Sequence, residues 1–182
     1  STGQCHMRVS FTAATGNYTG SVFVKKQDFD FIYMELGGAT AWFNISAGVL
    51  GNSNSYGSDW TYVDHKIEDY GNGWYRCILT GNCLNAGAYL FRSIQPVQSN
   101  GAYASNLLGG VTYWYGAQVE QLSYVTSYMP TAGSTATRLG ETAINAGDVN
   151  VFNSEEGALY AELSTNFEAS GGVKAVSVQY DV

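Results

Sequence analysis

Apolar and polar residues alternate in short stretches along residues 6–122, and clusters of glycine, asparagine and serine separate these stretches. A period of two is typical of β-strands, because successive side chains point to opposite faces of a sheet. That number of stretches is enough for two packed sheets, so we predict an all-β fold, a two-sheet antiparallel β-sandwich or jelly roll. The pattern predicts about eight strands, at residues 6–13, 21–26, 29–36, 39–46, 60–69, 74–80, 86–95 and 109–122.

Two segments of this pattern carry more specific predictions. Residues 29–36 read FDFIYMEL, which is apolar on both faces and therefore predicts a central strand. Residues 48–59 read GVLGNSNSYGSD and are rich in glycine, serine and asparagine, so we predict a loop there.

The character of the chain changes after Pro130. The stretch that follows is small, polar and without periodicity, which is typical of a linker or an extended surface segment. We predict a β-sandwich over residues 1–130, a linker or extended segment over 131–154, and strands of a truncated or accessory second β domain over 155–182. Because two strands alone are marginally stable in water, this last region must pack on the sandwich, pair with another chain or begin a second domain. We favour the last alternative.

The composition of the 182-residue chain supports short strands and limits its partners. It contains 22 glycines and 14 tyrosines, and only 13% of its residues are charged; rings fit pleated surfaces and glycine fits tight turns. The net charge of −7 argues against nucleic acid and anionic membrane surfaces, since both need a basic face. No run of 18 apolar residues occurs, so we expect no membrane insertion. Neutral ligands remain open, as do anions that meet a small basic patch.

The cysteines leave two alternatives. Cys5, Cys77 and Cys83 are odd in number, so at least one thiol is unpaired unless it bridges to another chain. Cys77 and Cys83 are close enough in sequence to cross-link a hairpin. The alternative, which we favour, is that they are buried free thiols in a reducing compartment.

Several tryptophans fall on polar faces when strand alternation is applied to them. In residues 39–46, alanine, phenylalanine and isoleucine occupy one face, while Trp42 shares the other with Thr40 and Asn44. In residues 60–69, Trp60 and Tyr62 share a face with two acidic side chains and a lysine. We therefore expect these rings to stand in solvent.

The strand predicted at residues 109–122 shows the same arrangement. Trp114 shares a face with Gln118 and Glu120, whereas two tyrosines and two valines form the apolar face. An exposed indole or phenol can stack on the apolar face of a sugar ring, while polar neighbours bond its hydroxyls. The alternative is that a loop or a neighbouring subunit covers each tryptophan. The predicted carbohydrate-binding residues are Trp42, Trp60, Tyr62, Trp114, Gln118 and Glu120.

No constellation typical of an enzyme occurs in the sequence. His6 and His65 have no cysteine or carboxylate at a metal-ligand spacing, so we predict that both are structural. Nucleophile-elbow, CxxC and phosphate-binding motifs are missing. The acidic pair that shares a face in residues 60–69 would lie about 13 Å apart, too far for a glycosidase. We predict no enzymatic activity and no cofactor, with a structural calcium at loop carbonyls and Asp59 or Asp69 left open.

Four motifs stand out along the chain. They are YTGSVFVKK at 18–26, ATAWFNISAGVLG at 39–51, IEDYGNGWYRCILTGN at 67–82 and YWYGAQVEQLSYVTSYMPTAGSTATR at 113–138. In this order they resemble a carbohydrate-binding-module-like β-sandwich that is common in bacteriophage tail-fibre and other virion proteins. The resemblance covers residues 5–138. EEGALYAELS at 155–164 is similar to the first strand of the concanavalin A-like lectin domain that often follows in such proteins.

This resemblance implies a jelly-roll domain that serves as an adhesion or spacer module, commonly within a trimeric fibre. Fold does not fix function, and we expect the motif residues to be structural, with Arg76 pairing with Glu120 or another carboxylate. Tyr115 stands where the family has a tryptophan before GAQ. If Tyr115 takes that position in the core, Trp114 points outward.

We therefore predict a non-catalytic carbohydrate-binding or adhesion module of a phage tail or other virion protein, with a polysaccharide or cell-surface glycan as its partner. The first alternative is a purely structural oligomerisation or spacer domain of a virion protein, whose rings are buried between the protomers of a homotrimer. The second is an accessory module of a secreted polysaccharide-degrading enzyme.

Overall fold

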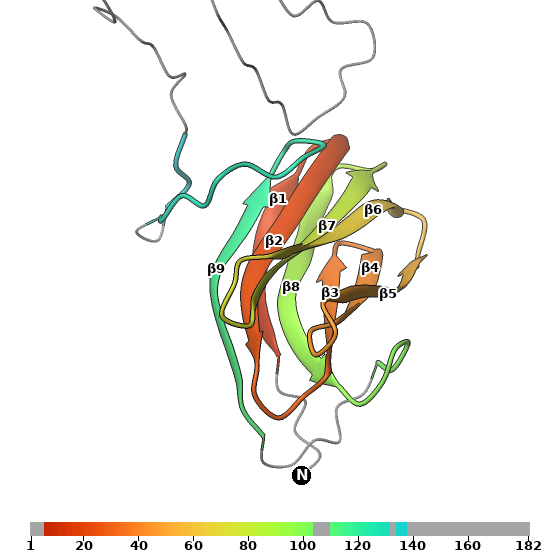
Figure 1. The fold of residues 1–182 in the computed structure, drawn as a ribbon. Coiled ribbons are helices and arrows are strands. Elements are labelled where there is room, and N and C mark those ends of the chain that lie inside the picture. The colour runs from red at the N-terminus through yellow and green to blue at the C-terminus, as the bar shows by residue number, and fades with distance from the viewer. Residues whose placement is uncertain (1–5, 104–109, 132–133, 138–182) are drawn as a thin grey trace, which may run out of the picture. The chain divides into compact units, whose positions relative to one another are not determined.

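The computed structural model describes residues 6–103, 110–131 and 134–137 (Figure 1). These residues form nine strands and no helix. The described part of the chain therefore contains no helix that is long and apolar enough to cross a bilayer. The predicted all-β class is confirmed. The strands are β1 (Met7–Ala13), β2 (Gly16–Lys26), β3 (Phe31–Leu36), β4 (Ala39–Asn44), β5 (Val49–Ser55), β6 (Trp60–Asp69), β7 (Trp74–Cys83), β8 (Gly87–Val97) and β9 (Thr112–Glu120).

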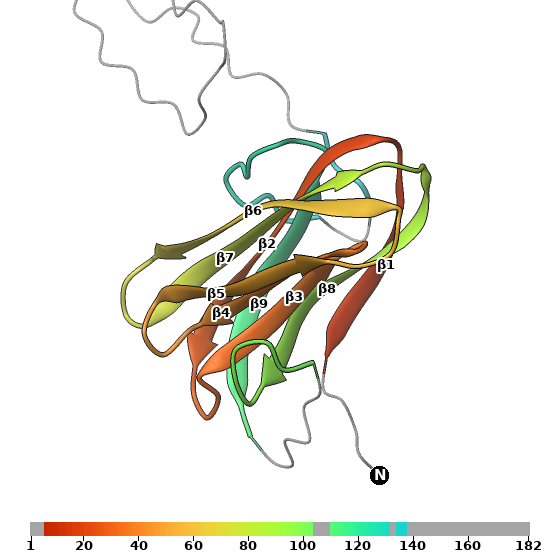
Figure 2. The ribbon, with the colours of Figure 1, turned by 90° about the vertical axis from the view of Figure 1, so that its right-hand side faces the viewer.

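The strands build two antiparallel sheets, which confirms the predicted β-sandwich. One sheet has five strands in the order β1-β8-β3-β4-β5, and the other has four in the order β6-β7-β2-β9. The two ribbon views show these sheets as separate layers (Figures 1 and 2). β3 lies in the middle of the five-stranded sheet, between β8 and β4, as its two apolar faces predict.

β5 occupies the segment predicted to be a loop, so that prediction is wrong. Val49–Ser55 pairs with β4 at the edge of the five-stranded sheet. Its glycine, serine and asparagine residues disfavour strands, but an edge strand is paired on one side only and its exposed positions accept polar side chains. A bulge adds one β5 residue opposite β4. Gly51 fits this bulge because an added Cβ would lie 2.7 Å from the carbonyl oxygen of Trp42.

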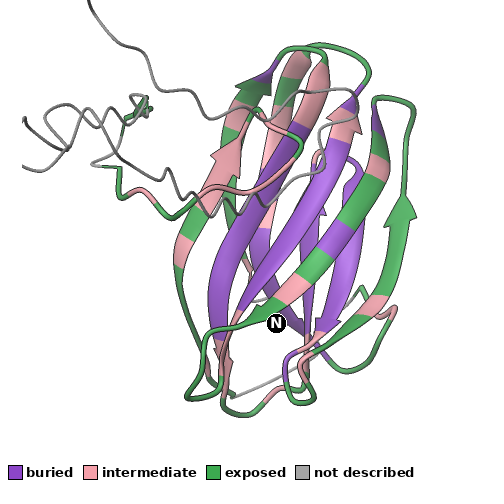
Figure 3. Cartoon of the chain, turned by 45° about the horizontal axis from the view of Figure 1, so that its top comes forward, coloured by how far each residue is buried: buried purple, intermediate pink, exposed green. Residues whose placement is uncertain are grey.

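The hydrophobic core fills the space between the two sheets. Trp60, Phe43 and Phe91 are among its largest fully buried side chains, and aliphatic residues of both sheets surround them. Buried positions follow the middle strands of both layers (Figure 3). Tyr33 and Trp42 belong to a second, smaller cluster, on the opposite face of the five-stranded sheet from the core residue Ile32.

A bulge in β6 changes which of its side chains face the core. Tyr62 pairs with Gly81, and Asp64 pairs with the very next β7 residue, so β6 contains one extra residue at Val63. Such an insertion reverses the alternation beyond it. Tyr62 and His65, three positions apart, therefore face the same side of the sheet.

A second bulge, in β9, has the same effect. Tyr115 pairs with Phe23 and Gln118 pairs with Ser21, so three steps along β9 match two along β2. Gly116 supplies the left-handed backbone, with φ at 65°, that a glycine bulge requires. Tyr115 and Gln118 consequently lie on the same outer face of the four-stranded sheet.

Cys77 and Cys83 are buried free thiols, so the cross-linked alternative is wrong and the predicted free, buried state of both thiols is confirmed. Both lie on β7, where six residues of strand separate them by about 20 Å, far beyond the reach of a disulfide. Cys5 lies outside the described residues.

The contacts of the chain divide it into two units, Ser1–Ala132 and Gly133–Val182. The nine strands all belong to the first unit. The strands predicted within residues 155–182, and most of the linker predicted at 131–154, lie outside the described residues.

Candidate functional site

The structure does not bring the six predicted binding residues together. Trp42 lies on the outer face of the five-stranded sheet, whereas the others belong to β6 and β9 of the four-stranded sheet. Two of the three tryptophans predicted to be exposed are buried, Trp42 at 2% and Trp60 at 1% exposure, while Trp114 is 36% exposed. Each placement has its own physical reason.

Trp60 is a core residue, so its predicted exposure is wrong. Its ring packs against the rings of Phe11, Tyr18 and Tyr89, with centroid distances of 5.2–6.1 Å. Gly37 lies directly against the indole, where an added Cβ would come within 2.2 Å of a ring carbon. The β6 bulge explains the error, because it sets Trp60 on the same face as the core positions that follow it in β6.

Tyr62 follows Trp60 onto the inner face and packs against the core, so it is not a free surface ring. Its hydroxyl lies 2.7 Å from Nδ1 of His65. The other ring nitrogen of His65 bonds the carbonyl oxygen of Gly51 at 3.1 Å and so links β6 to β5. Both residues therefore hold the edge of the sandwich together, and the structural role predicted for His65 agrees with these contacts.

Trp114 and Tyr115 take positions opposite to those expected from the family pattern. Tyr115 stacks on Phe23 on the outer face, with a centroid distance of 4.7 Å and an interplanar angle of 8°. Trp114 pairs with Val24, a fully buried core residue, and so faces the interior. It stays partly exposed because β9 is an edge strand.

Gln118 and Glu120 form hydrogen bonds with the segment that follows β9. The amide oxygen of Gln118 accepts a hydrogen bond from the backbone N–H of Met129 at 2.9 Å. The Glu120 carboxylate accepts hydrogen bonds from the backbone N–H and the hydroxyl of Thr126. Arg76 donates to the carbonyl oxygen of Thr126 at 2.7 Å and forms no ion pair with Glu120 in the described structure, unlike the expected pairing. These polar groups are thus occupied by the chain itself.

Trp42 occupies the face that alternation predicts, but a loop covers it. Its indole N–H donates to the carbonyl oxygen of Ala102 at 2.8 Å. Tyr33 packs on the indole from the neighbouring strand at 5.0 Å, and Tyr103 meets it edge-on at 4.9 Å and 81°. The predicted exposure of Trp42 is therefore wrong, because residues after β8 fold back over this sheet.

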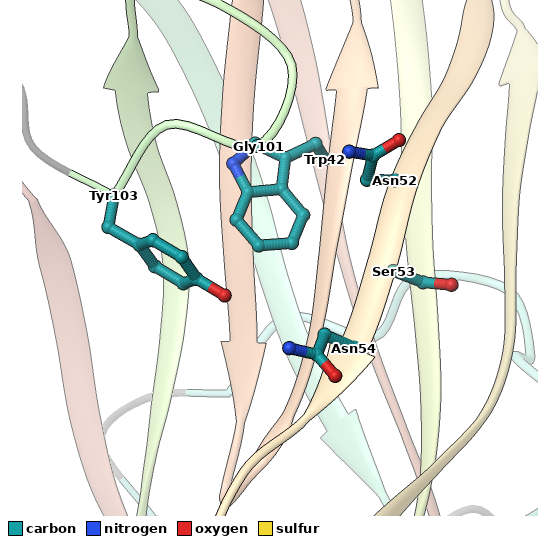
Figure 4. A pocket seen from close by; sticks show the side chains of 6 residues that line it. All are labelled: Trp42, Asn52, Ser53, Asn54, Gly101 and Tyr103. Atoms are coloured by element: carbon teal, nitrogen blue, oxygen red, sulfur yellow. The ribbon is translucent and has the colours of Figure 1, made fainter.

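A pocket of about 270 Å³ opens beside Trp42 (Figure 4). β4 contributes the indole, β5 contributes three polar residues, and the segment after β8 contributes a glycine and a tyrosine. Tyr103 is 52% exposed, so its ring presents apolar surface to solvent at the pocket wall. The lining residues are Trp42, Asn52, Ser53, Asn54, Gly101 and Tyr103.

Three side chains lock the loop in place over this face. Asn100 accepts a hydrogen bond from the backbone N–H of Asn52 at 2.7 Å and donates to the Asn52 amide oxygen at 3.0 Å. Gln95 donates to the carbonyl oxygen of Tyr103 at 2.6 Å. Together with the Trp42 indole bond, these contacts fix the position of Tyr103 relative to β5, so the pocket is preformed.

The orientation of the two pocket asparagines follows from their backbone partners. A backbone N–H can only donate, so the N–H of Ser55, at 2.8 Å, fixes the Asn54 side-chain oxygen as its acceptor. The same reasoning identifies the Asn100 oxygen as the acceptor of the Asn52 N–H, which leaves the Asn100 nitrogen to donate to Asn52. The side-chain nitrogens of Asn52 and Asn54 are then the free ends, and neither donates to any described residue.

A buried polar cluster lies on the same sheet face as the pocket. Glu35 is 5% exposed and accepts hydrogen bonds from the hydroxyls of Tyr33 and Tyr56. Arg92 donates to the same carboxylate at 2.7 Å. Burial, reinforced by the Glu35 charge, raises the pKa of Tyr33, and burial with the Glu35 hydrogen bond raises the pKa of Tyr56. Both phenols therefore stay neutral donors near pH 7, and the carboxylate is satisfied by its neighbours.

No cluster of three metal-ligating side chains occurs within residues 6–103, 110–131 and 134–137. Asp59 accepts a hydrogen bond from the Asn85 amide at 2.9 Å, and Asp69 accepts one from the backbone N–H of Gly71 at 2.7 Å. These two carboxylates, considered above for calcium, each bond a turn or loop residue.

Asn52, Asn54 and Tyr103 were missed by the sequence reasoning. Alternation within a strand over Val49–Ser55 would have placed the two asparagines on one face, but their composition suggested a loop. No periodic signal marks Tyr103, which lies in the segment after β8.

No protein-family model matches this sequence, and no curated protein is significantly similar to it.

Proposed function

We propose that the β-sandwich is a non-catalytic carbohydrate-binding module whose ligand site is the pocket beside Trp42. The observation that carries this proposal is the combination of an exposed aromatic wall, Tyr103, with two free amide donors, Asn52 and Asn54, around a preformed cavity. A sugar offers apolar C–H groups to a ring and oxygen acceptors to amides, which matches this lining. Of the six residues predicted from sequence, only Trp42 belongs to this site.

Binding without catalysis is supported by the chemistry of the lining. Apart from the Tyr103 phenol, the pocket has no titratable side chain among its lining residues. The nearby carboxylate of Glu35 is buried and paired with Arg92, which leaves it poorly placed to exchange protons with a ligand. A general acid or base needs direct or water-mediated reach to the reacting atom.

The biological setting that we propose is a phage tail or another virion protein that adheres to a cell-surface glycan. Support for this setting comes from the four sequence motifs alone. A preformed pocket that leaves the opposite sheet free fits an adhesion module within a larger assembly.

A glycan array probed with the full 182-residue chain tests this function. Bacterial surface polysaccharides and their monosaccharide units should include at least one ligand, and calorimetric titration of that ligand should show a loss of about tenfold or more in Tyr103→Ala, the equivalent of about 1.4 kcal/mol. Tyr113→Ala is the matched control, because Tyr113 is 50% exposed on the other sheet. Binding that fails throughout the array, or that responds only to Tyr113→Ala, contradicts the proposal.

A second candidate function is assembly through the outer face of the four-stranded sheet. Phe23 anchors an aromatic cluster there, in which Tyr70, Tyr115 and Tyr128 surround it and remain 53%, 46% and 39% exposed. Rings exposed together in this way favour a protein contact, as in the homotrimer that the motifs imply. Sedimentation velocity should then show a trimer that Tyr115→Glu dissociates, whereas a monomer at all accessible concentrations argues against this role.

A further inference from the structure

We propose that the pocket beside Trp42 recognises the N-acetyl group of a 2-acetamido sugar. This inference rests on the proposed function and narrows it to one ligand class. It follows from which hydrogen-bonding groups the pocket leaves free, from its charge and from its size.

The free polar groups contributed by the asparagines are donors. The backbone N–H of Ser55 occupies the Asn54 side-chain oxygen, and Asn100 occupies the Asn52 oxygen. Each asparagine oxygen thus already accepts one hydrogen bond, whereas each NH₂ group donates to no described residue and is the group left wholly free for a ligand. Figure 4 shows both side-chain nitrogens turned toward the side of the pocket where the rings of Trp42 and Tyr103 lie.

Two donors that face the same cavity favour a group that only accepts hydrogen bonds. A carbonyl oxygen has two lone pairs and no proton, so it can accept from both amides at once. A sugar hydroxyl must also place its own proton, and each asparagine oxygen already uses one of its two lone pairs within the chain. A polar group left without a partner in a site weakens binding strongly, so a carbonyl should be preferred over a hydroxyl at this position.

The apolar part of the lining suits the methyl of an acetamido group. Trp42 and Tyr103 stand nearly perpendicular, at 81°, and form an aromatic corner next to the amides. A planar acetamide presents its carbonyl to the donors and its methyl to the ring of Tyr103, which is 52% exposed. The pocket volume of about 270 Å³ lies below the roughly 300 Å³ at which sites for drug-sized ligands begin, so it fits one sugar residue with its substituent.

The charge around the pocket disfavours an acidic sugar, whose carboxylate oxygens could otherwise accept hydrogen bonds from the two asparagines. The pocket lining contains no lysine or arginine, and Arg92 on the same sheet is already paired with Glu35 at 2.7 Å. The chain carries a net charge of −7, which repels carboxylates. A neutral carbonyl is therefore favoured over a uronic or sialic acid group.

The test compares the methyl glycosides of N-acetylglucosamine and N-acetylgalactosamine with those of glucose and galactose, by saturation-transfer NMR and calorimetry on the full chain. At least one acetamido sugar should bind tenfold or more tightly than its parent. Asn54→Asp should remove this preference, because a carboxylate keeps the acceptor for Ser55 but cannot donate. Gln98→Glu is the matched control, since it makes the same amide-to-carboxylate change on an exposed side chain after β8 that does not line the pocket.

The outcomes separate this inference from the function on which it rests. Equal binding of acetamido and parent sugars, with Tyr103→Ala still abolishing it, overturns the acetamido preference and leaves the carbohydrate-binding function in place. An acetamido preference that survives in Asn54→Asp also overturns the assignment. Failure of every sugar and polysaccharide to bind overturns both. The melting curve of Asn54→Asp should match that of the parent chain, because Asn54 is exposed and the carboxylate keeps the acceptor for the Ser55 N–H.

Discussion

Replacing Asn100 with alanine releases the loop from β5 and tests whether the pocket is held open as described. The variant loses two hydrogen bonds, from the Asn52 backbone N–H at 2.7 Å and to the Asn52 amide oxygen at 3.0 Å. Each such bond contributes about 0.5–1.5 kcal/mol, so Asn100→Ala should lower the free energy of unfolding by about 1–3 kcal/mol. Asn52→Ala removes only the amide–amide bond and should lose about half as much.

Urea denaturation of both variants, with Gln98→Ala as control, measures these losses. Gln98 lies in the same loop and is exposed, so its replacement should change stability by less than about 0.5 kcal/mol. Glycan affinity should fall in Asn100→Ala even though Asn100 does not line the pocket, because the loop that carries Tyr103 is no longer fixed to β5. Equal losses of stability in Asn52→Ala and Asn100→Ala, or losses no larger than in Gln98→Ala, would show that the Asn100 hydrogen bonds do not hold the loop against β5.

Three further predictions concern the scaffold. Gly37→Ala should lower the free energy of unfolding, measured by urea denaturation, by about 3 kcal/mol or more. The φ of Gly37 is 63° and an added Cβ would lie 2.2 Å from the buried ring of Trp60. Gly57 has a φ of 72°, but an added Cβ there would meet nothing within 4 Å, so Gly57→Ala should lower the free energy of unfolding by only about 1–2 kcal/mol. Equal losses in the two variants would argue against the close approach of Gly37 to the Trp60 ring. Arg92→Met should lower the free energy of unfolding by about 3 kcal/mol, because it leaves the buried Glu35 carboxylate without its ion-pair partner. Lys66→Met removes an exposed ion pair that spans 3.7 Å and should lower the free energy of unfolding by less than about 1 kcal/mol. Similar melting temperatures for the two variants would contradict this ranking. Because the pKa of Tyr33 is raised in the folded state, the unfolded chain releases this proton first above about pH 10 and stability falls as pH rises. The fall should be shallower in Tyr33→Phe by up to about 1.4 kcal/mol per pH unit, and an unchanged slope would refute the shift.

Alternation along a strand is a reliable guide to side-chain direction only where the strand is regular. It placed Trp42 on the correct face of β4, since residues 39–44 pair with β3 without interruption. It failed for Trp60, because one extra residue at Val63 reverses the faces of β6. The β9 bulge at Gly116 reversed the expected directions of Trp114 and Tyr115 in the same way, while Gln118 kept the outer face that was expected of it. Bulges of this kind are set by pairing with the neighbouring strand, which local sequence does not reveal.

Burial was harder to predict than direction. Trp42 faces outward from the core, yet the loop that ends at Tyr103 covers it. This cover depends on hydrogen bonds between residues about 50 positions apart, such as Asn52 and Asn100. The candidate site could therefore be foreseen only in part. A polar face beside a tryptophan was visible in the sequence, whereas the pocket and its donors arise from long-range contacts.

The proposed function requires sugar binding in the pocket on the five-stranded sheet. Its most direct test is an NMR titration of the ¹⁵N-labelled chain with the tightest sugar from the glycan screen, following side-chain NH₂ and indole N–H signals. The NH₂ signals of Asn52 and Asn54 and the indole signal of Trp42 should shift together, with a single affinity, while that of Trp114 stays unchanged. A titration in which the Trp114 indole signal shifts and both asparagine signals stay unchanged would contradict sugar binding in this pocket.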